Sequence, residues 1–279
     1  MSLRTVLRLM AACTLLAAAA PVLAQTPSPL GEWQYSAGQI LRMRFDPNPP
    51  KWDTFLGLGG EVLPEYEGSS QYHFEPGPTI DIRYRNIAFL STGEGLGVNL
   101  LHSANYRAGI ALTYDLGRSE GEGTAYPLRG LGNLSASPAL KMFGEYVFFP
   151  VVVRGDVRYN VGGVGGWTGD LSVYSPVAGN EHYFVFVGGT VTFADQNNLQ
   201  HLVGVDQQES LQTGEPVYTP GGGLASAGLG VNATYIFSKH WFLNSVFAYS
   251  QLLGPLGNSP VIERQQQYAL SLSLAYNFR

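Results

Sequence analysis

The C-terminal segment is the feature that most restricts how this chain can fold. From Tyr268 to Phe278, every even-numbered residue is large and apolar, and every odd-numbered residue is small or polar. This period of two residues is the pattern of a β-strand with one apolar and one polar face. Aromatic residues lie at both ends of the apolar face, and a tilted strand of about 11 residues crosses a bilayer. The segment therefore favours a transmembrane barrel strand over the edge strand of a soluble sheet.

The first 24 residues predict export. Arg4 and Arg8 form a positive region, residues 9–20 are rich in Ala and Leu, and Val22-Leu23-Ala24 is a small-residue cleavage site. We expect residues 1–24 to be a signal peptide that is cleaved near Ala24.

Cys13 is the only cysteine, and it lies inside this predicted signal. Acylation of Cys13 as a lipoprotein is the disfavoured alternative, because only Leu9 to Ala12 would precede it as a hydrophobic stretch. Without Cys13 the exported chain has no thiol, which excludes disulfides, thiol catalysis and cysteine-based metal sites.

The composition fits an exported barrel. The chain has 35 glycines and 12% aromatic residues, and its 13% of charged residues is about half the share typical of globular domains. The formal net charge is −5 and there is no basic cluster, so we expect no nucleic-acid partner. Glycine-rich, aromatic-rich, alternating sequence is typical of a transmembrane β-barrel.

The alternation repeats along residues 52–279 and predicts an all-β, antiparallel, up-and-down transmembrane barrel of about 12 strands. Ten strands remain the alternative, if residues 87–101 form one bent strand and one further predicted strand is absent. Residues 25–51 contain several prolines and predict an extra strand, a periplasmic segment or a plug-like segment. The predicted strands lie near residues 52–62, 72–84, 87–91, 96–101, 106–116, 136–149, 150–161, 167–175, 181–194, 229–237, 240–252 and 268–278.

The connections between these strands predict an orientation. If the last strand runs towards the periplasm, the connections near residues 86, 103, 149, 178 and 238 are periplasmic, and most of them are short. The longer loops then face outside, at residues 64–70, 118–133, 195–226 and 253–266. Short periplasmic turns and longer external loops are the rule for outer-membrane barrels.

Charged residues on the polar faces are expected to point into the lumen. Both signs occur, so two interpretations compete: a polar network that fills a narrow lumen, or a charged water channel. Twelve strands give an intermediate diameter. Mixed signs and bulky arginines favour partial filling over a large general porin. The predicted inward charges are Asp81, Arg83, Arg85, Arg107, Asp115, Arg154, Asp156 and Arg158.

No catalytic, cofactor-binding or metal-binding residue is predicted. The five histidines lack close ligand spacing, and no G-x-S-x-G string or βαβ-associated glycine motif occurs. We therefore expect a protein that is not an enzyme and has no cofactor. The histidines are His73, His102, His182, His201 and His240.

Several strings in residues 52–279 resemble the MipA/OmpV family of outer-membrane proteins. The first is G-L-G-G-E-V-L-P-E-Y-E-G-S at residues 57–69. G-L-G-V-N-L-L at 95–101 and L-R-G-L-G at 128–132 are also similar to family strings. The most specific is Leu252-Leu253-Gly254 with Ser-Pro-Val-Ile at 259–262 and the closing Y-N-F.

The resemblance implies a noncatalytic barrel in the Gram-negative outer membrane, in contact with its lipids. MipA-like members are described as scaffolds that link a periplasmic lytic transglycosylase to a murein synthase during growth of the peptidoglycan. OmpV-like members are discussed as porin-like channels or surface adhesins, and these roles are the alternatives here.

The closing strand also resembles the C-terminal signal that the barrel-assembly machinery reads. We predict that Phe278→Ala lowers the amount of protein in outer-membrane fractions much more than deletion of Arg279, because the terminal aromatic residue carries that signal. Quantitative immunoblots of the fractions test this prediction. Equal levels of both variants and the wild type would contradict it.

Overall fold

The computed structural model describes residue 32 and residues 50–121 and 128–278. The predictions for residues 1–24 and for most of residues 25–51 therefore lie outside the described residues. Among the described residues, no helix is long and apolar enough to cross a membrane.

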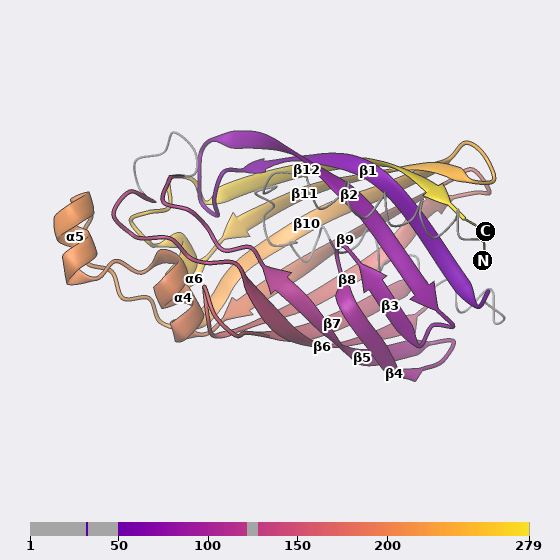
Figure 1. Ribbon diagram of the computed structural model, residues 1–279, viewed down its shortest axis with the longest axis horizontal. Coiled ribbons are helices and arrows are strands. Elements are labelled where there is room, and N and C mark those ends of the chain that lie inside the picture. The colour runs from indigo at the N-terminus through magenta and orange to yellow at the C-terminus, as the bar shows by residue number, and fades with distance from the viewer. Residues whose placement is uncertain (1–31, 33–49, 122–127, 279) are drawn as a thin grey trace, which may run out of the picture.

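Twelve antiparallel strands form one closed barrel (Figure 1). Each strand pairs with its neighbours in sequence, and the last strand pairs with the first. The all-β barrel of about 12 strands predicted from the sequence is therefore confirmed, and the ten-strand alternative is wrong. The strands are β1 (Trp52–Pro64), β2 (Tyr72–Tyr84), β3 (Ala88–Ser91), β4 (Gly95–His102), β5 (Tyr106–Asp115), β6 (Ser137–Phe148), β7 (Val151–Asn160), β8 (Trp167–Gly179), β9 (Tyr183–Ala194), β10 (Gly223–Ile236), β11 (Trp241–Leu252) and β12 (Gln266–Asn277).

The closing strand β12 has the predicted two faces. Leu270, Leu272 and Leu274 point outward and are 42–50% exposed, whereas Ser273 and Ala275 are buried inside the barrel. Their partners on β1 are small: Gly57 pairs with Ala275, and a Cβ on Gly57 would lie 2.3 Å from the carbonyl oxygen of Leu274. Glycine is required there because the two strands approach each other closely at the seam.

The two ends of the barrel differ as the sequence predicts. Short turns and the C-terminal end of β12 lie at one end, and the longer loops lie at the other (Figure 1). The loops also contain helices that the alternation pattern did not reveal: α4 (Gln196–Val203), α5 (Gln207–Thr213) and α6 (Gly254–Gly257). Local capping explains two of them. Asp195 caps α4, and Asp206 forms a capping box with Glu209 at the start of α5.

Aromatic side chains mark both rims of the outward surface. At the turn end, Trp52 packs against Tyr84, Tyr146 against Phe148, and Trp241 against Tyr276. At the loop end, Tyr159 packs against Trp167 and Tyr249 against Tyr268. Apolar side chains cover the outward surface between the two rims. Such girdles lie at the two interfaces of a membrane, so the pattern places the barrel across a bilayer.

An apolar cluster joins the four long loops over one end of the barrel. Tyr66, Leu131, Leu199 and Val261 come from four different loops and are buried together with seven further apolar residues. Hydrogen bonds reinforce the cluster: the hydroxyl of Tyr66 donates to the carbonyl of Val261 (3.3 Å), and Ser259 Oγ donates to the carbonyl of Val203 (2.6 Å). We call this cluster and its loops the lid.

We predict that Leu272→Arg destabilises the barrel because it places a charge on the lipid-facing surface near the middle of β12. The expected loss in free energy of unfolding is about 2–4 kcal/mol near the bilayer midplane, against about 0–1 kcal/mol near an interface. Tyr268→Arg, at the loop-end aromatic rim, is the matched control. Urea unfolding in lipid vesicles measures both, and equal losses for the two variants would contradict the assigned depth.

Candidate functional site

A network of buried charges fills the middle of the barrel and is the candidate functional site. Alternation along the strands turns these side chains inward, on the face opposite the lipid-facing leucines and aromatics. The network contains six carboxylates and five cations, which are Glu32, Asp81, Glu94, Glu145, Asp156 and Asp170, and Arg83, Arg107, Lys141, Arg154 and Arg158.

Glu94 is the centre of this network. It lies in the turn between β3 and β4 and is 1% exposed. Its carboxylate accepts hydrogen bonds from Arg83, from Arg107 (2.6 Å) and from Arg154 (3.2 Å). The backbone of this turn is held by Ser91, whose Oγ accepts from the amide of Gly93 (3.3 Å). Because the turn lies partway along the barrel wall and not at its rim, the carboxylate of Glu94 lies in the lumen.

The arginines bind carboxylates on neighbouring strands. Arg107 on β5 pairs with Glu145 on β6, with Nε 2.6 Å and Nη2 3.1 Å from the two carboxylate oxygens. Arg154 on β7 also reaches Glu145, at 2.7 Å. On β2, Asp81 and Arg83 are two residues apart, share one face and form two 2.7 Å hydrogen bonds. Such two-pronged pairs fix the orientation of both groups.

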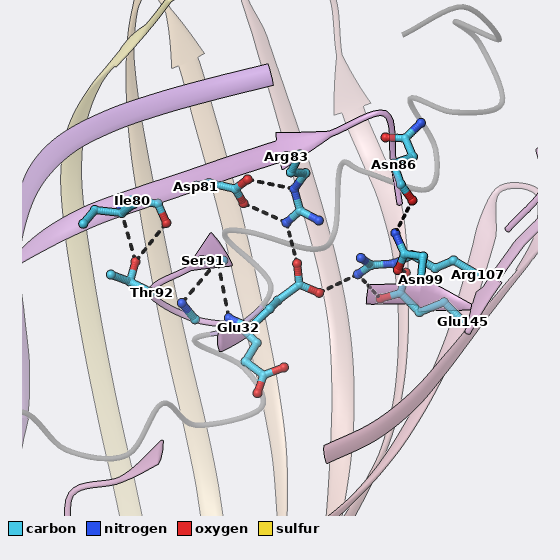
Figure 2. Close-up of polar contacts among 12 residues, drawn as sticks. Glu32, Ile80, Asp81, Arg83, Asn86, Ser91, Thr92, Asn99, Arg107 and Glu145 are labelled. Atoms are coloured by element: carbon cyan, nitrogen blue, oxygen red, sulfur yellow. Dashed lines mark hydrogen bonds and ion pairs between the residues drawn. The ribbon is translucent and has the colours of Figure 1, made fainter. Parts of the chain in front are cut away.

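The network crosses the lumen instead of following one wall. Glu94 connects Arg83 on β2 directly to Arg154 on β7. In the ring of 12 strands, β2 and β7 are separated by four strands on one side and six on the other, so they lie nearly opposite each other. Figure 2 shows Asp81 and Arg83 on one side of the lumen, with Arg107 and Glu145 on the other. The ion pairs therefore obstruct the axis of the barrel.

Glu32 adds a carboxylate from outside the barrel strands. Its side chain lies in the lumen, where it accepts from Lys141 Nζ (3.0 and 3.2 Å) and from Arg154 Nη2 (2.7 Å). At 2% exposure it is fully enclosed. A second group continues the network towards the next strands: Arg158 binds Asp156 at 3.1 Å and also pairs with Asp170.

Aromatic rings support the arginines. The guanidinium carbons of Arg107 and Arg154 lie 5.2 and 5.8 Å from the centre of the Phe143 ring. Arg83 lies 5.4 Å from the ring centre of Phe89, which packs edge-on against Phe143. Contacts of a cation with a ring face are attractive and become stronger away from water. The rings therefore occupy lumen space and restrict the arginine side chains.

The arrangement holds charge in place. In the described part of the chain, no group of three or more His, Cys, Asp or Glu side chains is arranged to bind a metal ion. The five histidines are dispersed over β2, the end of β4, two turns and α4.

Comparison with known proteins identifies the family. The family model described as "MltA-interacting protein MipA" matches residues 56–278, which is most of the chain and nearly all of the barrel. The chain belongs to the MipA family. This agrees with the resemblance of residues 52–279 to MipA/OmpV proteins, and it makes the barrel an outer-membrane protein.

Solved structures show distant likeness to this MipA-family barrel. The translocator domain of the autotransporter NalP from Neisseria meningitidis is 12% identical, with a TM-score of 0.46, covering 86% of this chain and 94% of that one. The NanC porin is 6% identical, with a TM-score of 0.45, covering 79% of this chain and 98% of that one. Comparison with curated protein sequences gives no match.

Most of the predicted inward charges join the network, but two do not. Arg85 was expected to point inward, and this expectation is wrong. β2 ends at Tyr84, and Arg85 lies exposed in the following turn with a φ of 49°. Asp115 lies at the end of β5, where its carboxylate accepts from the amide of Gly117 (2.8 Å). In both cases the strand ends where the alternation pattern would continue it.

Five members of the network were missed in the sequence. Lys141 and Glu145 occupy inward positions of β6, and Asp170 an inward position of β8, so counting alternate residues along these strands would have found them. Alternation could not have found Glu94, because this residue lies in a turn. Its place at the centre of the network depends on where that turn lies in the folded barrel. Glu32 lies before the first strand, so periodicity could not find it.

We predict that Arg154→Met strongly destabilises the MipA-family barrel. The substitution removes the cation that pairs with Glu32, Glu94 and Glu145. Breaking a buried ion pair by removing one partner costs about 3–5 kcal/mol. Lys239→Met, in the exposed turn after β10, is the control and is expected to change the free energy of unfolding by less than about 0.5 kcal/mol. Urea unfolding in vesicles measures both. Equal stability of the two variants would show that the charges of the lumen network are not buried.

Proposed function

We propose that this chain is a noncatalytic scaffold that binds a murein hydrolase of the MltA type at the turn end of the barrel and brings it together with a murein synthase. The observation that carries this proposal is the ion network across the lumen. A barrel whose axis is obstructed by buried ion pairs is poorly suited to passing solutes. Such a barrel is better suited to binding partners at its outer surfaces. The description of the family names an MltA partner.

The turn end offers apolar side chains for such a partner. Register shifts leave Leu100 unpaired between β4 and β5, and Val177 unpaired between β8 and β9. Leu100 is 63% exposed, Val177 is 58% exposed, and Phe149 in the turn between β6 and β7 is 53% exposed. Phe149 lies in a turn, and Leu100 and Val177 lie near the ends of β4 and β8 at the same end of the barrel. β-bulges often redirect side chains at rims, and exposed apolar groups near a rim fit a protein contact.

The proposal predicts that a triple variant with Leu100→Ser, Phe149→Ser and Val177→Ser loses most of its binding to a lytic transglycosylase. Pull-down from detergent-solubilised membranes, using the tagged barrel, measures this binding. The matched control is Leu211→Ser with Val217→Ser, two exposed apolar residues at the opposite, loop end. This control is expected to bind like the wild type. Enrichment no greater than that of an unrelated barrel would refute the scaffold function.

A small-solute channel is the competing function, and a second measurement separates the two. Purified barrel in a planar bilayer is expected to be silent, because the ion network crosses the lumen. Steady single-channel conductance from correctly folded protein would favour the channel and count against the scaffold.

A further inference from the structure

The barrel wall is incomplete on one side of β2. On its other side, β2 pairs with β1 along its whole length, from Trp52 opposite Tyr84 to Pro64 opposite Tyr72. Its pairing with β3 covers only residues 81–84. The turn between β3 and β4 then reverses the chain, and the last backbone hydrogen bond runs from the amide of Thr92 to the carbonyl of Ile80 (2.9 Å).

Beyond that turn, the next strand of the wall is β5, and it does not reach β2. The pairing of β4 with β5 ends at Leu96 opposite Leu112. Residues 113–115 of β5 continue with β6 on their other side. Among the described residues, residues 72–79 of β2 have no strand partner on the β3 side. We call this interruption between β2 and β5 the wall break.

Two prolines on the unpaired edge of β2 prevent another strand from forming regular hydrogen bonds with that edge. The amide and carbonyl of Ile80 both point to the β3 side, where they meet Thr92. Backbone groups alternate along a strand, so residues 76 and 78 point to the same side, and both are proline. Proline has no amide hydrogen and is found on edge strands. Neither a further strand nor a second copy of this chain can pair regularly with this edge.

The wall break lies within the lipid-facing part of the sheet. Pro78 is in register with Leu58 and, across β1, with Leu274 of β12. The outward side chains around the break are apolar and strongly exposed: Leu58 is 74% exposed and Phe74 is 66% exposed. The break therefore lies in the part of the wall that faces hydrocarbon.

Polar side chains line the inner side of the wall break. Gly77 faces inward, and a Cβ placed on it would meet no atom of the described residues within 4 Å. Its inward neighbours on β2 are Glu75 and Thr79, and Glu61 on β1 is directly opposite Glu75. On β2 the network residues Asp81 and Arg83 follow this stretch towards the turn end. Polar side chains therefore face the lumen on the inner side of the break, and apolar side chains face the bilayer on its outer side.

We propose that the wall break is a lateral binding port for an amphipathic lipid of the surrounding leaflet. The acyl part lies against Leu58 and Phe74, and a polar head group with hydrogen-bond donors enters the lumen beside Glu61 and Glu75. A lipid fits where a strand does not, because it requires no backbone hydrogen bonds from β2. The port is independent of the scaffold function, since it lies in the opposite half of the barrel from the turns.

A fluorescence-quenching experiment on the full-length barrel tests the port. Gly77→Cys is labelled with an environment-sensitive thiol probe, which is selective because Cys13 is the only other cysteine and precedes the predicted cleavage site. The labelled barrel is reconstituted in vesicles that contain phosphatidylethanolamine, whose ammonium group donates hydrogen bonds, with or without brominated acyl chains. Leu58→Cys, on the lipid-facing surface, is the positive control. Ser271→Cys, inward on the complete wall and in register with Glu61, is the negative control.

Fluorescence at residue 77 is expected to fall in brominated vesicles by nearly as much as at residue 58, with little loss at residue 271. Quenching at residue 77 no greater than at residue 271 would overturn the proposal. Quenching of the probe at residue 77 by iodide added to the aqueous phase would not change that conclusion. Heat-modifiable migration on gels shows that each variant is folded. If Gly77→Cys does not fold, Thr79→Cys supplies the same reading from the neighbouring inward position.

Discussion

The hydrogen-bonded seam between β1 and β12 is the constraint on which the whole structure depends. In hydrocarbon no water is available to unpaired backbone groups, so a sheet can span the membrane only if its first and last strands meet. Here Gly57 and Gly59 on β1 face Ala275 and Ser273 on β12, and a Cβ on either glycine would lie within 3 Å of the other strand. The small residues let the seam close, so β1 and β12 meet and the ring of strands is completed.

Closure also explains why so many charges can be buried. Once the wall exists, every inward position either faces water or must find a partner in a confined space. Arg83, Arg107 and Arg154 meet this demand by converging on Glu94. Buried ion pairs add little net stability over apolar packing of the same volume, because desolvation offsets their attraction. Their main effect here is geometric: they fix side chains from nearly opposite strands across the axis.

Much of this architecture could be predicted from the sequence, because a period of two residues is a local property. The alternation in residues 268–278 and 151–161 located strands and assigned their faces correctly. The network was only partly predictable, because its centre depends on relations that are not local. Glu94 is central because β3 and β4 turn back partway along the barrel wall. Glu32 joins the network because a residue outside the barrel strands reaches Lys141 and Arg154. The prediction that Arg85 points inward was wrong because the strand, and with it the alternation, ends one residue earlier.

The shared apolar core of the lid limits how the exposed surface of this protein can diversify. A substitution at Leu131 or Val261 changes the packing of loops that are far apart in the sequence, so these loops must vary together. The helix α5 is different, because none of its residues is buried and its ends are fixed by its own capping box and by Gly214. Substitutions are therefore tolerated more readily in α5 than on the buried faces of the loops.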